Sequence, residues 1–287
     1  MAGKQYLSSN GKILNADNLF ISPNNRSFRY GDGFFETMKM INGKIALEDY
    51  HFERLFASLE LLQFEKPNYF TTEYLRKNIE ELAQKNGYLK LARIRLMIYR
   101  GDGGLYDPEN HFPNHLIQTW ELNSSVNNLN ENGLVIDIFK DARKACDNYS
   151  HIKSNNYLSY AMAALWAKKN HLNDAILLNG YNRIADATIA NVFIVKDGKV
   201  KTPSLDEGCV NGVMRRHLIA CMRKENIHIE EGNIETEELF EASEVFFSNS
   251  IYGIKWTRQC NKNNYTNDLA TMLHKKFIHD VFYAEQT

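Results

Sequence analysis

One lysine and one aspartate have the side chains needed for cofactor chemistry at an amino group. Lys153 lies in the segment HIKSNNYL, and Asp186 follows it along the chain. A lysine amine condenses with an aldehyde cofactor, and a carboxylate can hold a pyridine nitrogen protonated. Both residue types are common on protein surfaces, so this pair indicates chemistry only where other segments of the chain fit it.

Length and composition suit a globular enzyme of one or two domains. The 287 residues are 44% hydrophobic and 24% charged, which is enough for a sizeable core. A formal net charge of −1 gives no general attraction to nucleic acid or to an anionic membrane. No apolar run approaches the roughly 20 residues of a membrane span. Because the first residues also lack a hydrophobic signal region, we expect a cytoplasmic protein.

Neither cysteine nor histidine spacing indicates a metal site. Four scattered cysteines lack any Cys-x-x-Cys spacing, so we expect reduced thiols: Cys146, Cys209, Cys221 and Cys260. His111 and His115 have the step of a helical ligand pair, but Pro113 between them is incompatible with a helix interior. We expect two ordinary loop histidines.

Hydrophobic periodicity predicts helices and strands that do not strictly alternate, which favours an α+β fold. The expected helices cover 49–64, 72–86, 157–170, 212–225 and 269–283, and the expected strands cover 89–99, 115–122, 134–139, 175–178, 191–195 and 244–247. Asp197-Gly198 predicts a two-residue hairpin turn. The Asn- and Ser-rich stretch 123–132 predicts a linker between an N-terminal domain, 1–122, and a C-terminal domain, 133–287.

Six short motifs occur in a fixed order: YGDGFFET, HFERL, IKSNNYL, DATIANVF, TPSLDEGCVNGVMR and FFSNSIYGIKW. Over roughly residues 25–257 the chain resembles the fold-type IV pyridoxal-phosphate enzymes, also called class IV aminotransferases. That group includes branched-chain and D-amino-acid aminotransferases and 4-amino-4-deoxychorismate lyase. The resemblance implies a two-domain α+β fold, with a smaller N-terminal domain and a larger cofactor-binding domain that has a barrel-like sheet. It also implies a homodimer.

The same resemblance assigns the residues that bind pyridoxal 5'-phosphate. Lys153 would form the imine and afterwards move protons at the substrate carbon. Arg54 would bind the phosphate with its guanidinium fork, since no carboxylate lies three or four residues away to pair with it. The other phosphate-binding residues would be Val213 and Met214 at a helix start after Gly212, and Asn249 and Ser250 after a strand.

Two assignments leave alternatives open. Asp186 takes the place of the family's usual glutamate and would keep the pyridine nitrogen protonated. Aspartate is one methylene shorter, so an ordinary exposed carboxylate or a protein that binds the cofactor with little turnover are alternatives. Tyr157 lies one residue from the place of the ring-oxygen tyrosine of branched-chain enzymes, and the alternative is a packed aromatic residue.

Three details favour the lyase branch of the family. VNGVMR, the RGDGGL loop after Tyr99 and NSIYGI are similar to lyase segments, and aminotransferases usually carry threonine in place of Met214. Thr37 takes the place of a lyase hydroxyl that assists proton transfer, or is a β-branched strand residue. Substrate binding falls to Tyr30 and Arg100, although Arg100 is equally expected as an exposed loop charge.

The expected reaction converts 4-amino-4-deoxychorismate to 4-aminobenzoate and pyruvate, a step of folate synthesis. The alternative is a class IV aminotransferase that acts on branched-chain or D-amino acids with 2-oxoglutarate. A second alternative is a cofactor-binding protein with little turnover. In each case the partner is a small amino compound.

Overall fold

A computed structural model describes residues 5–283 and divides the chain into two compact units. The first unit runs to Ser124 and also takes in Lys153–Asn156. The second unit comprises Ser125–Ile152 and the chain from Tyr157 onward. The short segment that carries the candidate lysine therefore packs with the N-terminal unit, although it lies beyond the expected linker in sequence.

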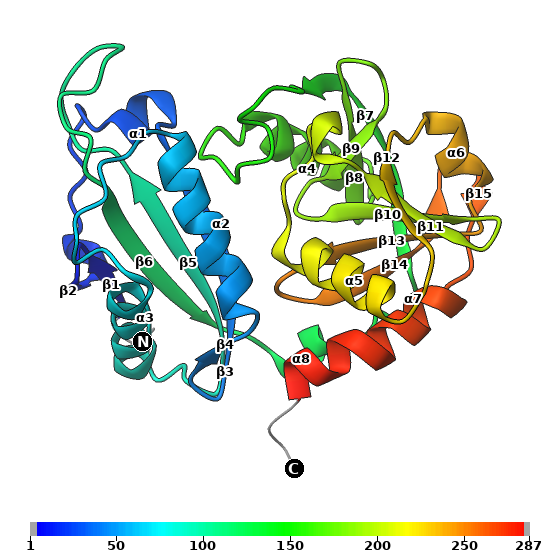
Figure 1. Cartoon of the computed structure of the whole chain (residues 1–287), viewed down its shortest axis with the longest axis horizontal. Helices are drawn as coiled ribbons and strands as arrows, with labels where there is room; N and C mark the ends of the chain where they lie inside the picture. Colours follow the sequence, from blue (N-terminus) through cyan, green and yellow to red (C-terminus); the bar gives the residue numbers. More distant parts are fainter. Residues whose placement is uncertain (1–4, 284–287) are drawn as a thin grey trace. The chain divides into compact units, whose positions relative to one another are not determined.

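The first unit is an antiparallel sheet with helices on one face (Figure 1). Its strands, in the order β2-β1-β6-β5-β3-β4, are β1 (Tyr6–Ser9), β2 (Lys12–Asn15), β3 (Gly33–Ile41), β4 (Lys44–Ile45), β5 (Leu91–Tyr99) and β6 (Asn114–Glu121). Its helices are α1 (Arg26–Tyr30), α2 (Glu48–Leu61) and α3 (Thr72–Asn86). In β3, alternate side chains point to opposite faces, so Phe34 and Met38 face the helices while Phe35 and Thr37 face away.

The two long helices of this unit lie where the sequence predicts them. Helix α2 buries Phe52, Leu55 and Leu59, which follow the three- and four-residue steps of one helix face. Helix α3 begins after Thr71, whose Oγ1 accepts a hydrogen bond from the Tyr74 N–H, and ends at Gly87 with φ of 77°.

The second unit is built on a mixed sheet in the order β12-β11-β10-β13-β14-β7-β8-β9, with β15 added at β14. Its strands are β7 (Leu134–Lys144), β8 (Asp174–Asn179), β9 (Ile184–Ala187), β10 (Asn191–Lys196), β11 (Lys199–Pro203), β12 (Ile229–Gly232), β13 (Glu244–Asn249), β14 (Gly253–Cys260) and β15 (Asn263–Asn264). Its helices are α4 (Leu158–Lys169), α5 (Val213–Lys224), α6 (Thr236–Glu241), α7 (Asp268–Leu273) and α8 (His279–Tyr283). The pairs β7–β8, β7–β14 and β11–β12 are parallel.

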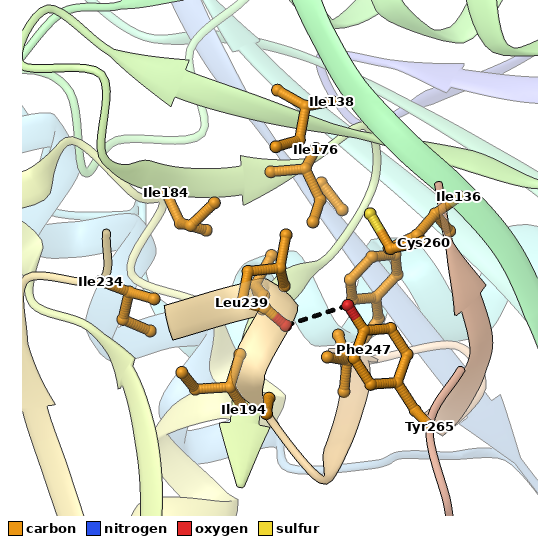
Figure 2. Packing of buried hydrophobic residues seen from close by; sticks show 14 of the residues in the cluster. Ile136, Ile138, Ile176, Ile184, Ile194, Ile234, Leu239, Phe247, Cys260 and Tyr265 are labelled. Atoms are coloured by element: carbon orange, nitrogen blue, oxygen red, sulfur yellow. Dashed lines mark hydrogen bonds between the residues drawn. The ribbon is translucent and has the colours of Figure 1, made fainter. Parts of the chain in front are cut away.

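This sheet curls, because its last strand β9 also packs beside β10. The curl encloses a core of branched side chains, among them Ile136, Ile176 and Ile194, with Tyr265 at its edge (Figure 2). The Tyr265 hydroxyl donates to the Leu239 carbonyl at 2.9 Å, so the one polar group of that ring is satisfied (Figure 2). The expected α+β fold with a barrel-like C-terminal sheet is confirmed.

Some local predictions are corrected by the structure. The helix expected over 269–283 contains a π-helical segment, His274–Ile278, between α7 and α8. His115 is not a loop residue: it lies in β6, buried, with its ring against Phe70 and Tyr74. The hairpin at Asp197-Gly198 is confirmed, with φ of 50° and 73°.

The linker segment is held against the second unit. Asn130 accepts a hydrogen bond from the Trp256 backbone N–H and donates to its carbonyl, and the Trp256 indole donates to the Asn130 carbonyl. Across residues 5–283, no helix combines the length and apolar character required to cross a membrane.

Candidate active site

Backbone hydrogen bonds attach Lys153 to strand β3. The Phe35 N–H donates to the Lys153 carbonyl, and the Asn155 N–H donates to the Gly33 carbonyl, each at 3.0 Å. Gly33 is required here, because a Cβ would lie 2.2 Å from the Ile98 carbonyl oxygen and φ is 154°. These contacts bring the Lys153 amine over the Phe35 ring, with Nζ 5.0 Å from the centroid.

The sheet face that carries Phe35 also carries Thr37 and Lys39 of β3 and Arg95 of β5. Thr37 lies opposite Arg95 of β5, whose guanidinium carbon is 4.0 Å from the Phe35 ring centroid. Lys39, two residues further along, is fully buried, and burial lowers its pKa to about 7. The Thr37 hydroxyl and the Arg95 guanidinium therefore lie on the sheet face of Phe35, the ring that also contacts the Lys153 amine.

The opposite face of β3 carries a buried cluster of Glu36, His51 and Arg54, called here the Glu36 cluster. Arg54 donates from Nε and Nη2 to the two Glu36 oxygens at 2.7 and 2.6 Å, and His51 Nδ1 lies 2.6 Å from Glu36 Oε2. Burial alone raises the pKa of Glu36, but the Arg54 charge and the His51 hydrogen bond outweigh it and hold the pKa at about 2. Burial lowers the pKa of His51, so this imidazole is neutral at pH 7.

Arg54 therefore has a carboxylate partner that helical spacing does not reveal. Glu36 interrupts an alternating apolar face that includes Phe34, Met38 and Met40, and a lone carboxylate there needs a buried partner. That interruption, together with His51 and Arg54 on the buried side of α2, is the signal that could have identified the cluster from sequence.

Tyr30 and Arg100, the expected substrate-binding residues, are both held by other groups of this unit. The Tyr30 ring lies beneath the Arg26 and Arg29 guanidinium groups. Arg100 is buried and is not an exposed loop charge. It pairs with Asp32 and donates hydrogen bonds to the carbonyls of Leu62 and Gln63. Its guanidinium also lies over the Phe64 ring. These contacts favour a structural role for Arg100 over a carboxylate clamp.

Asp186 lies in the second unit, buried, with three hydrogen-bond donors around its carboxylate. Oδ1 accepts from Asn191 Nδ2 at 2.9 Å, and Oδ2 accepts from the Tyr160 hydroxyl at 2.9 Å and the Val210 N–H at 2.8 Å. The alternative of an exposed carboxylate is wrong. A carboxylate oriented by three donors keeps a defined direction, as a partner for a pyridine nitrogen requires. Tyr160 and Asn191 were not singled out by the sequence.

Helix α5 begins beside this carboxylate. Gly212 is its N-cap and supplies no side-chain cap, so the first N–H groups, which include those of Val213 and Met214, point from an uncapped helix start. A Cβ on Gly212 would lie 1.8 Å from Asn191 Oδ1. The glycine is thus required by Asn191, the same residue that orients Asp186.

Tyr157 lies next to Tyr160, whose hydroxyl donates to Asp186. Its ring stacks on Tyr160 with 4.2 Å between centroids, and its hydroxyl donates to the Thr188 carbonyl at 3.4 Å. Stacking supports the packed-aromatic alternative, while the contact to Tyr160 connects Tyr157 to Asp186.

Asn249 and Ser250 lie at the end of β13. Asn249 Oδ1 accepts from the N–H groups of Ile251 and Tyr252 at 3.0 Å, and its Nδ2 donates to the Ile189 carbonyl. The Asn249 side chain therefore shapes this turn, and Ser250 lies within it.

The donor set fits pyridoxal 5'-phosphate. In the first unit, Lys153 has the amine that would condense with the aldehyde, and Arg54 has the guanidinium that would bind the phosphate. In the second unit, the buried Asp186 carboxylate would pair with the pyridine nitrogen, and the uncapped helix start after Gly212 would suit phosphate oxygens.

Comparison with known proteins identifies the family. The family model for amino-transferase class IV matches residues 33–257. The aminodeoxychorismate lyase of Bacillus subtilis (strain 168) is 30% identical over 295 residues and the D-alanine aminotransferase of Listeria monocytogenes serotype 4b (strain F2365) 25% identical over 287, each alignment covering 96% of both chains. The branched-chain aminotransferase of Thermoproteus uzoniensis, solved with norvaline, has a TM-score of 0.87 at 23% identity and covers 99% of this chain and 97% of its own. The chain therefore belongs to the class IV aminotransferase family, and it is a pyridoxal-phosphate-dependent enzyme as its motifs predict.

Proposed function

We propose that this protein is an aminodeoxychorismate lyase that releases pyruvate and forms 4-aminobenzoate. The observation that carries the proposal is the common strand face of Phe35 and Thr37, with the Lys153 amine over the Phe35 ring. That arrangement supports proton transfer by an amine and a hydroxyl on one side of a bound ring. The VNGVMR segment at the start of α5 and the Bacillus subtilis relative support the same branch.

In this proposal each residue has one task. The cofactor supplies the electron sink when it is bound. Lys153 removes the proton from the ring carbon that bears the substrate amine, and Thr37 assists that transfer. As the carbon–oxygen bond to the three-carbon side chain breaks, Lys153 returns the proton to the departing enol, and the ring becomes aromatic.

The remaining residues hold the cofactor. Asp186 would accept a hydrogen bond from the protonated pyridine nitrogen. Arg54 and the start of α5 are each assigned to phosphate oxygens. Tyr157, Asn249 and Ser250 are assigned to the edges of the same cofactor. The family resemblance implies that the active protein is a homodimer, and this stays a prediction.

A class IV aminotransferase is the second candidate, and Arg95 is the observation that favours it. Its guanidinium lies opposite Thr37 and over the ring that also contacts the Lys153 amine, where it suits the α-carboxylate of an amino acid. The Listeria D-alanine aminotransferase supports this candidate as well. Aminodeoxychorismate is also a carboxylate, so Arg95 alone does not separate the two reactions.

One incubation separates the candidates. Purified protein with aminodeoxychorismate and no keto acid should produce 4-aminobenzoate and pyruvate in equal amounts. The matched reaction with D-alanine or a branched-chain amino acid and 2-oxoglutarate should transfer little amino group. Turnover only when 2-oxoglutarate is present would exclude the lyase. A protein that binds the cofactor but turns over no donor would support the binding alternative.

A further inference from the structure

We propose that Glu36 and His51 are positioning residues that hold the Arg54 guanidinium in the orientation required for a phosphate ester. The inference rests on the proposed function, because it takes Arg54 as the phosphate-binding residue. It extends that function to two side chains that would act through Arg54.

The geometry of the Glu36 cluster fixes the guanidinium plane. Two parallel N–H···O bonds, at 2.7 and 2.6 Å, join the Nε–Nη2 edge of Arg54 to both Glu36 oxygens. A bidentate fork defines both the direction and the rotation of a planar group, whereas a single bond would leave rotation open. Arg54 is held on α2 and Glu36 on β3, so the pair also fixes the arginine relative to the sheet.

His51 fixes the carboxylate in turn. Its Nδ1 lies 2.6 Å from Glu36 Oε2, and the neutral ring that burial enforces must donate this hydrogen bond, since the carboxylate is ionised. Tautomer and direction of the imidazole are thereby set. Among residues 5–283, His51 Nε2 is a buried nitrogen without a hydrogen-bond partner.

The net charge of the Glu36 cluster indicates that the cluster orients Arg54 and does not attract the phosphate from a distance. Glu36 is ionised and His51 neutral, so the cluster of one carboxylate and one guanidinium carries no net charge. A neutral pair attracts a distant anion weakly, and its contribution must come from donors that are already in place when the anion arrives. Glu36 should therefore matter for ligands that carry a phosphate and little for the same ligands without one.

The test compares pyridoxal 5'-phosphate with pyridoxal, which lacks the phosphate. Affinities for both are measured by absorbance titration of the full-length apoprotein, for the natural protein and for the variants Glu36→Gln, His51→Gln and Arg54→Lys. Glu48→Gln is the matched control, because Glu48 is also a carboxylate of this unit paired with an arginine, Arg76. Pyridoxal binding and far-ultraviolet circular dichroism report whether each variant is folded.

We expect Glu36→Gln and His51→Gln to weaken pyridoxal 5'-phosphate binding about tenfold or more, by analogy with the loss when partners that orient a ligating group are removed. Pyridoxal binding should change less than about twofold, and Glu48→Gln should change neither. Equal weakening of both ligands in both variants would show a purely structural role and overturn the inference, as would unchanged affinities. If Arg54→Lys leaves the preference for the phosphate intact, the assignment of Arg54 itself fails. If Arg54→Lys removes the preference while Glu36→Gln and His51→Gln retain it, only the positioning role fails.

Should Glu36→Gln not fold, Glu36→Asp replaces it. Aspartate keeps the charge but is one methylene shorter, so it should still lower the preference for the phosphate. A folded Glu36→Asp with the natural ratio of affinities would contradict the positioning role.

Discussion

Asn191 connects Asp186 to the start of helix α5. Its Nδ2 donates to Asp186 Oδ1 at 2.9 Å and to the Val210 carbonyl at 2.7 Å. Its Oδ1 occupies the space that a side chain on Gly212 would need. One amide therefore orients the carboxylate assigned to the pyridine nitrogen and sets how closely the helix start assigned to the phosphate approaches it.

This relationship predicts a coupled effect of two substitutions. Gly212→Ala alone should destabilise the protein by about 1–3 kcal/mol, because the new methyl group collides with Asn191. Asn191→Ala alone should cost about 1–3 kcal/mol, because it leaves buried polar groups unsatisfied. In the double variant the collision is absent. Its loss of unfolding free energy should therefore be smaller than the sum of the two single losses, by roughly 1 kcal/mol or more.

Urea unfolding followed by circular dichroism measures this cycle. Gly180→Ala is the control, because a Cβ there meets no atom within 4 Å. Strictly additive free energies of unfolding for the Asn191 and Gly212 variants would mean that the two residues do not constrain each other.

A second prediction concerns the pH dependence of stability. Burial lowers the pKa of His115 to about 4 from an ordinary value of 6.5. The unfolded chain therefore binds a proton at higher pH than the folded protein, so stability from the neutral ring is present above pH 6.5 and is lost as the pH falls through 4. The shift corresponds to roughly 3 kcal/mol at the acid limit.

The variant His115→Leu removes this titratable group. Its free energy of unfolding should fall less steeply between pH 6.5 and 4 than that of the natural protein. His279→Gln, at an exposed position, should leave the slope unchanged. An identical slope in the natural and His115→Leu proteins would show that His115 is not the group responsible.

The sequence predicted those parts of the fold that depend on local patterns. Apolar residues at helical steps and Gly87 define α2 and α3, and Asp197-Gly198 has the backbone angles that its hairpin turn requires. The π-helical segment inside the last helix, His274–Ile278, was not predicted, because its apolar spacing differs little from that of an α-helix.

The sequence indicates candidate site residues one at a time, but it does not indicate the side chains that contact them. Glu36 and Arg54 are far apart in sequence, and their pairing depends on how α2 packs on β3. Asp186 was expected in the role of the family's glutamate, with its shorter reach left open, and nothing local indicated that Tyr160 and Asn191 would surround it. Long-range contacts of this kind follow from tertiary packing, which a single sequence does not encode in its local pattern.

A third prediction tests the lysine. Lys153→Ala should remove the visible absorbance band of the bound cofactor and lower turnover by at least about a thousandfold, because both covalent attachment and proton transfer are lost. Lys144→Ala is the matched control, since Lys144 is a lysine near an aromatic ring of the second unit, Tyr160, and has no assigned role in the reaction. Retention of the band in Lys153→Ala would assign the cofactor to another amine.

The last prediction tests Thr37 as a proton-transfer group. Thr37→Val keeps the β-branched shape that the strand favours but removes the hydroxyl. We expect kcat for formation of 4-aminobenzoate to fall by about 10²-fold, the lower end of the range for a positioned acid–base group. The KM should change little, because the hydroxyl acts only while the proton is in transit. Thr37→Ser, which retains the hydroxyl, should recover most of the rate. A Thr37→Val enzyme with natural kcat, or a Thr37→Ser enzyme as slow as the valine variant, would assign this position to the packing of β3 and leave Lys153 as the sole proton carrier among the residues assigned here.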